Sequence, residues 1–480
     1  MATLVEEQSH HVHDGEAVPP LRQRALNGCS LVTDRAGRFL LGAPDFAKRL
    51  RDRRPSAADK VLLEAHGLWP RSQLEQLAAR FAAQRRQCAA GPLDYLILVP
   101  TLRCNLSCSY CQVSRAALDA SGHDWTPDTL AQVLTLVRGL EAPTVKIEFQ
   151  GGEPTLRPDL IRAVMNAVPD GVEASFVICT NLQRLDADLL ALFDRPDVQI
   201  STSLDGAADV HARQRHGERD AITPFLANLD LVLRRYGPGK VSALPTVDPV
   251  APPVIETLVE AFVARGFTSI YLRPINYQGF ARKRHPRAIE VGAAWRDYHT
   301  AFIRHLIERN WADRSQLIEE SYFSLLLRRI FRPGEDRHVD LRSPNPMGRD
   351  YIVIDHDGLA YPSDEARMLT RAGVIDLAIG TAANWDTPAR AALEAAATNA
   401  DNPDCEHCVY QPFCGRDIFD DLSRYGTIAL PRPDTDFCRR HLDLFDLAFE
   451  LIHDTDPVVQ YSLRRWLGLP GDDLTLGHPA

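Results

Sequence analysis

A short apolar run leads directly into a cysteine loop at Tyr95-Leu-Ile-Leu-Val-Pro100-Thr-Leu-Arg-Cys104-Asn-Leu-Ser-Cys108-Ser-Tyr-Cys111. The apolar residues predict a buried strand, and the CxxxCxxC loop leaves its carboxyl end. Three thiolates at this spacing can hold three irons of a 4Fe–4S cluster, and the fourth iron is left without a protein ligand. A zinc loop or three unliganded thiols are the alternatives, but structural zinc favours CxxC pairs and four protein ligands. The spacing therefore favours a cluster with one open iron.

This loop, with Tyr110 just before its last cysteine, resembles the radical SAM superfamily. In that superfamily the open iron chelates the amino and carboxylate groups of S-adenosylmethionine (SAM), and one electron from the cluster yields a 5′-deoxyadenosyl radical. The resemblance implies that Cys104, Cys108 and Cys111 hold the SAM-binding cluster and that Tyr110 lies beside the cofactor.

Residues 93 to about 290 alternate strand and helix, which predicts a parallel sheet with crossover helices. The expected strands are 95–100, 145–150, 173–180, 199–204, 240–247 and 269–273, and the expected helices include 127–139, 157–167 and 224–235. Six such units match the open, partial (β/α)6 barrel of radical SAM enzymes. Reactive groups should then gather at the C-terminal ends of the strands.

Candidate cofactor contacts follow these strand ends. Gly151-Gly152-Glu153-Pro154 comes after the second strand, where glycines permit close backbone approach. By resemblance, this segment lines up the methionine amino group of SAM, with Glu153 on the substrate side. Asn181 ends the third strand and is expected to donate a hydrogen bond to SAM or substrate. Cys179, just before it, is expected to be a buried small apolar residue.

The fourth strand ends in Ser201-Thr-Ser-Leu-Asp-Gly206. By resemblance, Ser203 bonds the adenosyl ribose and Arg215 pairs with the methionine carboxylate, with Arg213 as the second candidate for that carboxylate. Asp205 is expected to shape the turn.

A second cysteine group, Cys405-x2-Cys408-x5-Cys414 followed by Cys438, resembles the cluster-bearing SPASM extension. The resemblance implies that these four cysteines hold an auxiliary 4Fe–4S cluster. A second auxiliary cluster would need cysteines where this chain has Ile418 and Ser363, so we expect two 4Fe–4S clusters in all. A tetrahedral zinc site is the alternative for the four cysteines.

The chain has 480 residues, 45% of them hydrophobic, and is expected to hold several domains. We expect a disordered segment at 1–20, a small winged-helix-like module at 21–92, the barrel at 93–300, the cysteine-rich extension at 301–445 and a helical tail at 446–480. Within the module, 31–41 predicts two short strands around a turn, and helices are expected at 45–51, 57–66 and 73–86. The module resembles peptide-recognition elements that bind a leader peptide at a sheet edge, and the alternative is a structural cap on the barrel.

The composition of the chain limits the classes of partner and the compartment that we expect. The net charge of −10 is spread along the chain, so no basic footprint indicates a nucleic acid. No apolar run approaches the roughly 20 residues of a membrane span, and the first 20 residues do not resemble a signal peptide. Ten cysteines, several at ligand spacings, indicate a reducing cytoplasm and metal binding rather than disulfides.

Several segments resemble the His-Xaa-Ser-system radical SAM maturases (HxsB type), although related cyclophane-forming maturases share much of this pattern. These segments are Tyr110-Cys-Gln-Val-Ser-Arg115, Tyr361-Pro-Ser-Asp-Glu-Ala-Arg-Met368, Tyr410-Gln-Pro-Phe-Cys-Gly415 and Arg432-Pro-x3-Phe-Cys-Arg439. The resemblance implies an oxidoreductase that modifies a ribosomally made precursor peptide with His-Xaa-Ser repeats. It also implies a low-potential electron donor such as flavodoxin or ferredoxin, and a second radical SAM maturase as partner. One departure is Gly415-Arg-Asp-Ile-Phe-Asp420, which is less typical after the third cysteine.

The implied reaction removes a hydrogen atom from a side chain, at the β-carbon, and closes an intramolecular crosslink with a net loss of two hydrogens. We assign no catalytic base, because each of the acidic residues of the segment that would face the active site is better explained as a turn former or ion-pair partner. These residues are Asp355, Asp357, Asp364 and Glu365. Three alternatives stay open: sulfatase-maturase-like oxidation of Cys or Ser in a protein, a small-molecule radical SAM enzyme, and a catalytically silent subunit that delivers peptide to a partner maturase.

Overall fold

The computed structural model describes residues 21–69, 79–81, 83, 91–112, 115–215, 222–276, 278–285, 292–332, 338, 341–400, 402–469 and 475–477. The disorder expected at 1–20 lies outside these ranges, as does most of the helix expected at 73–86.

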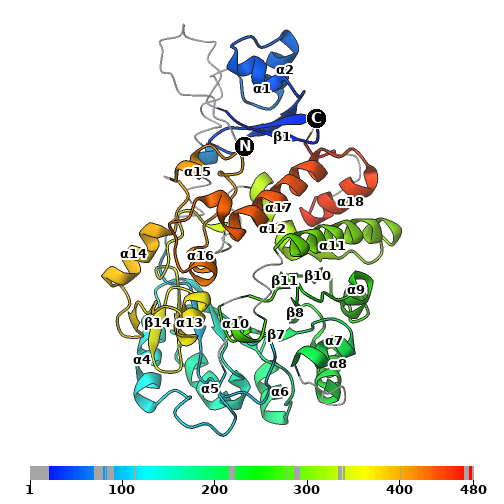
Figure 1. Ribbon diagram of the computed structural model, residues 1–480. Helices are drawn as coiled ribbons and strands as arrows, with labels where there is room; N and C mark the ends of the chain where they lie inside the picture. The colour runs from blue at the N-terminus through cyan, green and yellow to red at the C-terminus, as the bar shows by residue number, and fades with distance from the viewer. Residues whose placement is uncertain are drawn as a thin grey trace.

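Parallel strands form the centre of the fold. In the sheet order β15-β14-β13-β4-β5-β6-β7-β8, the strands β4 (Tyr95–Leu98), β5 (Thr144–Phe149), β6 (Glu173–Cys179), β7 (Val198–Ser203) and β8 (Val241–Leu244) are parallel neighbours. The helices α4 (Pro127–Arg138), α5 (Pro158–Met165), α6 (Ala187–Phe193), α8 (Thr223–Tyr236) and α9 (Ile255–Val263) lie around them in the lower part of Figure 1. The predicted α/β partial barrel is confirmed.

The fifth and sixth strands are each broken once. Pro245 separates β8 from β9 (Thr246–Val247), because proline has no N–H to give to a ladder. The sixth strand is divided into β10 (Ser269–Ile270) and β11 (Arg273–Pro274), and the intervening Leu272 amide donates to the Glu320 carboxylate at 3.0 Å. Because β11 pairs with β9 and β10 pairs with β12 (Glu319–Glu320), the barrel wall still continues past β8.

The C-terminal extension adds strands to the opposite edge of the barrel sheet. β13 (Tyr351–Ile354) pairs in parallel with β4, and β14 (Leu359–Tyr361) and β15 (Gly380–Thr381) follow it in antiparallel order. All four residues of β13 are buried, as expected for a strand with neighbours on both sides. The strand that carries the cysteine loop is therefore an internal strand of the sheet.

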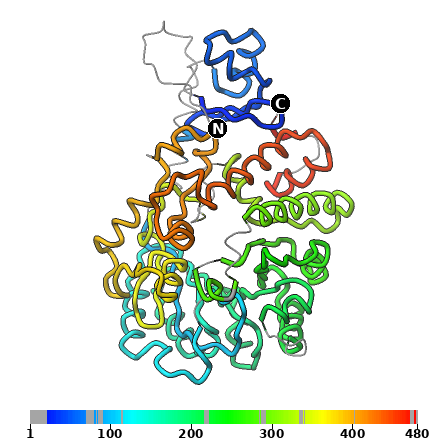
Figure 2. Tube along the Cα trace, in the orientation of Figure 1, coloured from blue at the N-terminus to red at the C-terminus, as the bar shows by residue number. Residues whose placement is uncertain are grey.

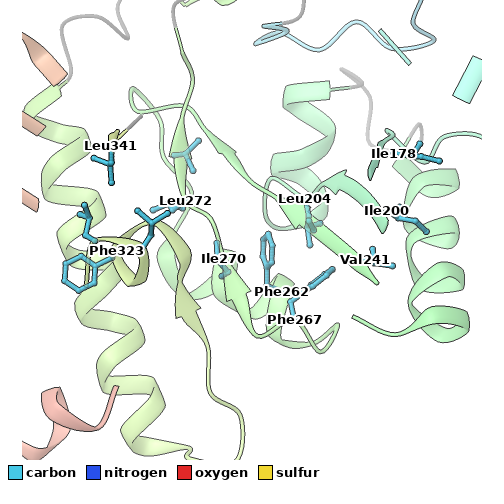
Figure 3. Close-up of a cluster of buried hydrophobic side chains, with 14 of the residues drawn as sticks. Ile178, Ile200, Leu204, Val241, Phe262, Phe267, Ile270, Leu272, Phe323 and Leu341 are labelled. Atoms are coloured by element: carbon cyan, nitrogen blue, oxygen red, sulfur yellow. The ribbon is translucent and has the colours of Figure 1, made fainter. Parts of the chain in front are cut away.

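One hydrophobic core connects the barrel to the extension. Figure 3 shows Ile200, Leu204 and Phe262 of the barrel in the same cluster as Phe323 and Leu341 of the extension. Each of these five side chains is at most 1% exposed. The extension is thus packed onto the barrel rather than attached through a flexible linker.

The extension is mainly helical, and its helices lie above the barrel and along one side of it (Figure 1). Its helices are α11 (Gly292–Ala312), α12 (Ser321–Phe331), α13 (Asp364–Arg371), α14 (Pro388–Ala396), α15 (Pro403–Glu406), α16 (Ile418–Tyr425), α17 (Asp436–His453) and α18 (Pro457–Trp466). α11 runs through the expected boundary at 300/301, and α17 runs through the one at 445/446. The expected boundaries were placed by motif, whereas an amphipathic helix continues for as long as its apolar face is covered.

The N-terminal strands form a small antiparallel sheet, β1 (Arg22–Leu26), β2 (Cys29–Thr33) and β3 (Phe39–Gly42), with helices α1 (Phe46–Arg51) and α2 (Ala57–Ala65) above it. We call residues 21–69 the N-terminal module. The expected 31–41 strand pair and the first two helices are present. Figure 2 shows this sheet against the part of the chain that carries the late cysteines, away from the parallel barrel strands. The alternative of a cap on the barrel is therefore not the arrangement observed.

Side chains of β1 and β2 attach the module to the extension. Arg24 donates to both Asp446 oxygens, at 2.6 and 2.5 Å, and Asp446 also accepts from the Tyr410 hydroxyl. Thr33 donates to the Val409 carbonyl at 2.7 Å.

None of the described helices is long and apolar enough to cross a membrane.

We predict that Asp446→Asn loosens the N-terminal module, because the substitution weakens the interactions of both Arg24 and Tyr410. Amide hydrogen exchange in β1 and β2 should become about tenfold faster, which corresponds to about 1.4 kcal/mol. Asp194→Asn, in an exposed ion pair with Arg235 on the barrel, is the control and should leave exchange in β1 and β2 unchanged. Equal exchange in the two variants would contradict this docking role.

Candidate active site

A cavity of about 580 Å³ lies at the C-terminal ends of the barrel strands, with its opposite wall supplied by the extension. This volume is in the range of small-molecule and cofactor sites. Every residue expected to bind the first cluster or SAM lines this one cavity: Cys104, Cys108, Tyr110, Cys111, Gly151, Gly152, Glu153, Asn181, Ser203 and Arg215. Arg213, the second candidate for the SAM carboxylate, is exposed and does not line it.

Backbone hydrogen bonds from three segments hold the cysteine loop in place. The Ser109 amide donates to the Gln214 carbonyl of α7 (Ala208–Arg215) at 2.8 Å, and the Phe280 amide donates to the Cys111 carbonyl at 3.0 Å. The third contact comes from the glycine segment that follows β5. Burial raises the pKa of Cys104 to about 12, so a bare thiolate there is costly and a bound metal would compensate for it.

Gly151 and Gly152 lie against the backbone that leads into the cysteine loop. A Cβ on Gly151, whose φ is +129°, would lie 2.3 Å from the Thr101 carbonyl oxygen, and one on Gly152 would lie 2.2 Å from that of Arg103. The close approach allows the Gly152 amide to donate to Thr101 and the Glu153 amide to donate to Arg103. The two glycines therefore position the cysteine loop itself.

Glu153 joins the ends of two strands. Its carboxylate is buried and accepts from the Asn181 amide at 2.7 Å and from the Thr155 hydroxyl at 2.6 Å. Burial raises the pKa of Glu153. The Asn181 side chain donates in turn to Asn105 at 2.7 Å, inside the cysteine loop. Glu153 and Asn181 therefore set the relative positions of the second and third strand ends and the loop.

Asp205 anchors the arginine of the site. This fully buried carboxylate accepts from Arg215 at 2.8 Å, from the Tyr110 hydroxyl at 2.9 Å and from the Thr246 amide at 3.1 Å. The Arg215 guanidinium also lies over the Tyr110 ring, 5.2 Å from its centroid. The sequence analysis gave Asp205 only a role in its own turn, whereas its side chain bonds three other segments. Ser203 ends β7 and lines the same cavity.

A polar group inside the barrel was missed by sequence reasoning. The Glu148 carboxylate accepts from Tyr95 at 2.7 Å, Gln150 at 2.7 Å and Cys179 at 3.3 Å, and it lies 3.2 Å from the Lys146 ammonium. Cys179 therefore has a polar partner and is not simply an apolar filler. The signal was present in β5, where Lys146 and Glu148 alternate with the buried apolar residues Val145, Ile147 and Phe149 and so share one face of the strand.

The wall opposite the cluster loop carries aromatic and titratable side chains. Tyr271 comes from the sixth barrel strand, between β10 and β11, and the extension supplies Trp295, His299, Tyr322, His338, Tyr351, Asp364, Glu365, Asp417, Asp420, Arg424 and Arg440. Burial raises the pKa of Asp364, whose carboxylate lies 2.7 Å from Arg367. Asp355, by contrast, does not line the cavity and lies 2.6 Å from Arg371 in an ion-pair network. Of the four acidic residues considered as bases, Asp364 and Glu365 reach the cavity.

The four late cysteines lie around α15, the segment after it and the start of α17. Burial raises the pKa of Cys405 to about 11 and that of Cys438 to about 12, and the thiols of Cys408 and Cys414 shift in the same direction. Among the described residues, the one group of three or more His, Cys, Asp or Glu whose ligand atoms all lie within 4.8 Å of one another is Asp355, His356 and Asp357. The four thiols can hold either an iron–sulfur cluster or a tetrahedral zinc ion, since both take four cysteine ligands.

Comparison with known proteins agrees with this geometry. Residues 98–250 match the model of the Radical SAM superfamily, so the segment that holds the first three cysteines and all the proposed SAM contacts is a Radical SAM domain. GTP 3′,8-cyclase of Erythrobacter litoralis is 33% identical over 142 residues, which cover 28% of this chain and 41% of that protein. PqqA peptide cyclase of Bradyrhizobium diazoefficiens is 33% identical over 147 residues, 30% of this chain and 38% of that protein. The chain thus spans about two fifths of each of these relatives.

Among solved structures, native anSMEcpe with bound AdoMet superposes with a TM-score of 0.58 at 18% identity, over 75% of this chain and 97% of that one. A further structure of that protein, which holds AdoMet and the Cp18Cys peptide, gives a TM-score of 0.57 at 16% identity. It also covers 75% of this chain and 97% of that one. At this identity the likeness concerns the fold, which extends well beyond the Radical SAM domain.

We predict that Asp205→Asn weakens SAM binding at least about tenfold, because Arg215 and Tyr110 lose the carboxylate that orients them. Breaking this buried ion pair should also lower the free energy of unfolding by about 3–5 kcal/mol. Calorimetric titration of the cluster-loaded protein with SAM measures the first effect, and denaturant unfolding measures the second. Asp209→Asn, at an exposed position of α7, is the control. Unchanged SAM affinity in Asp205→Asn would rule out the anchoring role.

Gly151→Ala should displace the cysteine loop, because the new methyl group would overlap the Thr101 carbonyl. We expect the iron content per chain to fall and the 5′-deoxyadenosine yield to drop with it. Gly171→Ala is the matched control, since Gly171 also has a positive φ of +90° but has no atom within 4 Å of an added Cβ. An equal loss in both variants would assign the effect to backbone strain instead of the close approach.

Proposed function

We propose that this chain is a radical SAM maturase that crosslinks side chains within a ribosomally made peptide. The observation that carries the proposal is the single cavity in which the three-cysteine loop faces a wall of aromatic and charged residues from the extension. A wall of this composition suits an extended peptide, whose side chains need both apolar contact and hydrogen bonds. The names of two similar proteins, a PqqA peptide cyclase and anSMEcpe with a bound peptide, are in keeping with a peptide substrate.

Cys104, Cys108 and Cys111 would hold the 4Fe–4S cluster, and the strand ends would hold SAM. Arg215, oriented by Asp205, would pair with the carboxylate of SAM, and Ser203 would bond the ribose. Tyr110, Gly151, Gly152, Glu153 and Asn181 would shape the remaining wall. When bound, the cluster and SAM supply a 5′-deoxyadenosyl radical that takes one hydrogen atom from the β-carbon of a peptide residue.

Closing the crosslink releases a second hydrogen from the peptide as a proton and an electron. The cavity wall contains groups that can take the proton, among them the carboxylates of Asp364 and Glu148. The electron needs an acceptor other than the peptide. An auxiliary 4Fe–4S cluster on Cys405, Cys408, Cys414 and Cys438 would serve as this acceptor, because zinc has no redox chemistry and could not take the electron.

The N-terminal module would bind the leader part of the peptide. Within the described residues, β1 and β3 each pair only with the central β2, so each has an outer edge that can accept a peptide strand. Because this module is attached to the extension, a leader bound to it would lie on the same assembly that closes the cavity.

The finer assignment is a His-Xaa-Ser-system (HxsB-type) maturase, carried by the segments around Tyr110, Tyr361 and Tyr410. With it we propose a precursor with His-Xaa-Ser repeats, a second radical SAM maturase as partner, and a flavodoxin or ferredoxin as electron donor. The cysteines must stay reduced, rather than form disulfides, to bind 4Fe–4S clusters. We therefore place the reaction in the reducing cytoplasm.

The test is the mass of a precursor peptide with His-Xaa-Ser repeats, encoded beside this chain, after anaerobic co-expression with the enzyme. The wild type should lower the peptide mass by about 2 Da per modified motif, and Cys104→Ala should abolish this loss because it removes a ligand of the SAM-binding cluster. Cys29→Ala, which removes a thiol outside both cysteine groups, is the control and should behave as the wild type.

Two outcomes would contradict the proposal. An unchanged peptide mass while the purified enzyme still produces 5′-deoxyadenosine would mean that this peptide is not the substrate of this chain acting alone. Absence of 5′-deoxyadenosine from the cluster-loaded wild type would instead favour the peptide-delivery subunit.

A further inference from the structure

Two buried arginines beside the late cysteines each have an N–H group without a hydrogen-bond acceptor among the described residues. These groups are Nη1 of Arg22 and Nε of Arg416. The two side chains belong to residues that are 7% and 8% exposed, so water does not replace the missing acceptors. A buried, unsatisfied guanidinium N–H is unfavourable and points to an acceptor that the polypeptide itself does not supply.

Arg22 comes from the N-terminal module and reaches into the cysteine segment. Its Nε donates to the Glu406 carbonyl at 2.8 Å, between Cys405 and Cys408, and its charge interacts with Cys408. Thr33 of the same sheet bonds the Val409 carbonyl, the residue after Cys408. The module therefore holds both ends of the turn that carries Cys408, and the guanidinium of Arg22 lies beside this turn with its Nη1 group unsatisfied.

Arg416 belongs to the cysteine segment itself, two residues after Cys414. Its Nη2 donates to the Ile428 carbonyl at 3.0 Å, and its charge interacts with Cys405 and with Asp421. Arg22 and Arg416 thus come from segments nearly 400 residues apart in the chain, and their charges interact with Cys408 and Cys405 of the same cysteine group.

Two other arginines near these cysteines do not have this property. Arg24 donates to both oxygens of Asp446, and Arg432 donates to Asp421. Their charges are balanced by carboxylates, and neither has an unsatisfied nitrogen.

We propose that Arg22 and Arg416 donate N–H···S hydrogen bonds to the auxiliary cluster, so that the N-terminal module helps to set the reduction potential of this cluster. The inference rests on the proposed auxiliary 4Fe–4S cluster and adds to it a positioning role for a residue of the N-terminal module. Hydrogen bonds and positive charge directed at cluster sulfurs stabilise the reduced state and raise the potential. A cluster held in this way is suited to accept an electron from the peptide, and displacement of the module would lower its potential.

The experiment is an anaerobic potentiometric titration monitored by electron paramagnetic resonance, on the full chain with Cys104, Cys108 and Cys111 all replaced by Ala. In this background the auxiliary cluster alone contributes the signal, and no SAM or peptide is needed. Arg22→Gln should lower the midpoint potential, and Arg22→Lys, which keeps the charge but loses the second N–H, should lower it less. Arg54→Gln, which removes one exposed positive charge from the same module, is the control and should leave the potential unchanged.

The outcomes separate this inference from the proposed function. Full iron content with equal potentials in Arg22→Gln and Arg54→Gln would overturn the inference alone. Zinc in place of iron in the unsubstituted background would overturn the auxiliary cluster together with the inference, while the peptide-mass test would still stand. If Arg22→Gln fails to retain iron, the midpoint potential is measured in Arg22→Lys and Arg416→Gln instead. A potential below that of the unsubstituted background supports the inference, and an unchanged potential overturns it.

Discussion

The buried carboxylate of Asp205 is the point at which four segments of the active site meet. It bonds Arg215 on α7, Tyr110 in the cysteine loop and the Thr246 amide at the start of β9, and it follows directly on β7. A fully buried carboxylate is stable only when cations and N–H or O–H donors surround it, so each of these segments must keep its position. The loop that presents the cysteines is therefore fixed from the barrel side by electrostatics and from β5 by the close approach of Gly151 and Gly152.

The extension adds strands to the barrel sheet and side chains to the wall of the cavity. β13 pairs with β4, so the strand that leads to Cys104 has neighbours on both sides, and the extension supplies the far wall of the cavity. The N-terminal module in turn bonds the cysteine segment of the extension through Arg22 and Thr33. The N-terminal module is thereby linked to the barrel through the extension. A peptide bound to the module would be attached to the same body that holds both cysteine groups.

The parts of the site that follow one strand or one loop were predictable. The CxxxCxxC spacing, the glycine pair, Asn181 and Arg215 all line one cavity, because parallel strands bring their C-terminal ends to one edge. The partners of these residues were not predictable. Asp205 looked like a turn residue, and the role of Glu148 depends on Tyr95 and Cys179, which lie on the two strands beside its own. Hydrogen bonds between strands have no spacing rule in the sequence.

By itself, the sequence determined the alternation of strands and helices, the two groups of cysteines and the edge of the sheet at which the chemistry-bearing residues lie. These depend on local patterns of apolar, glycine and cysteine residues, which act over a few residues. Only the tertiary structure decided that β13 continues the barrel sheet, that Asp205 orients Arg215 and that Arg22 reaches the segment of Cys405 and Cys408. Each of these is a contact between distant segments, and burial selects such contacts only when the whole chain is packed, because a charge removed from water must find its partner wherever the fold has placed it.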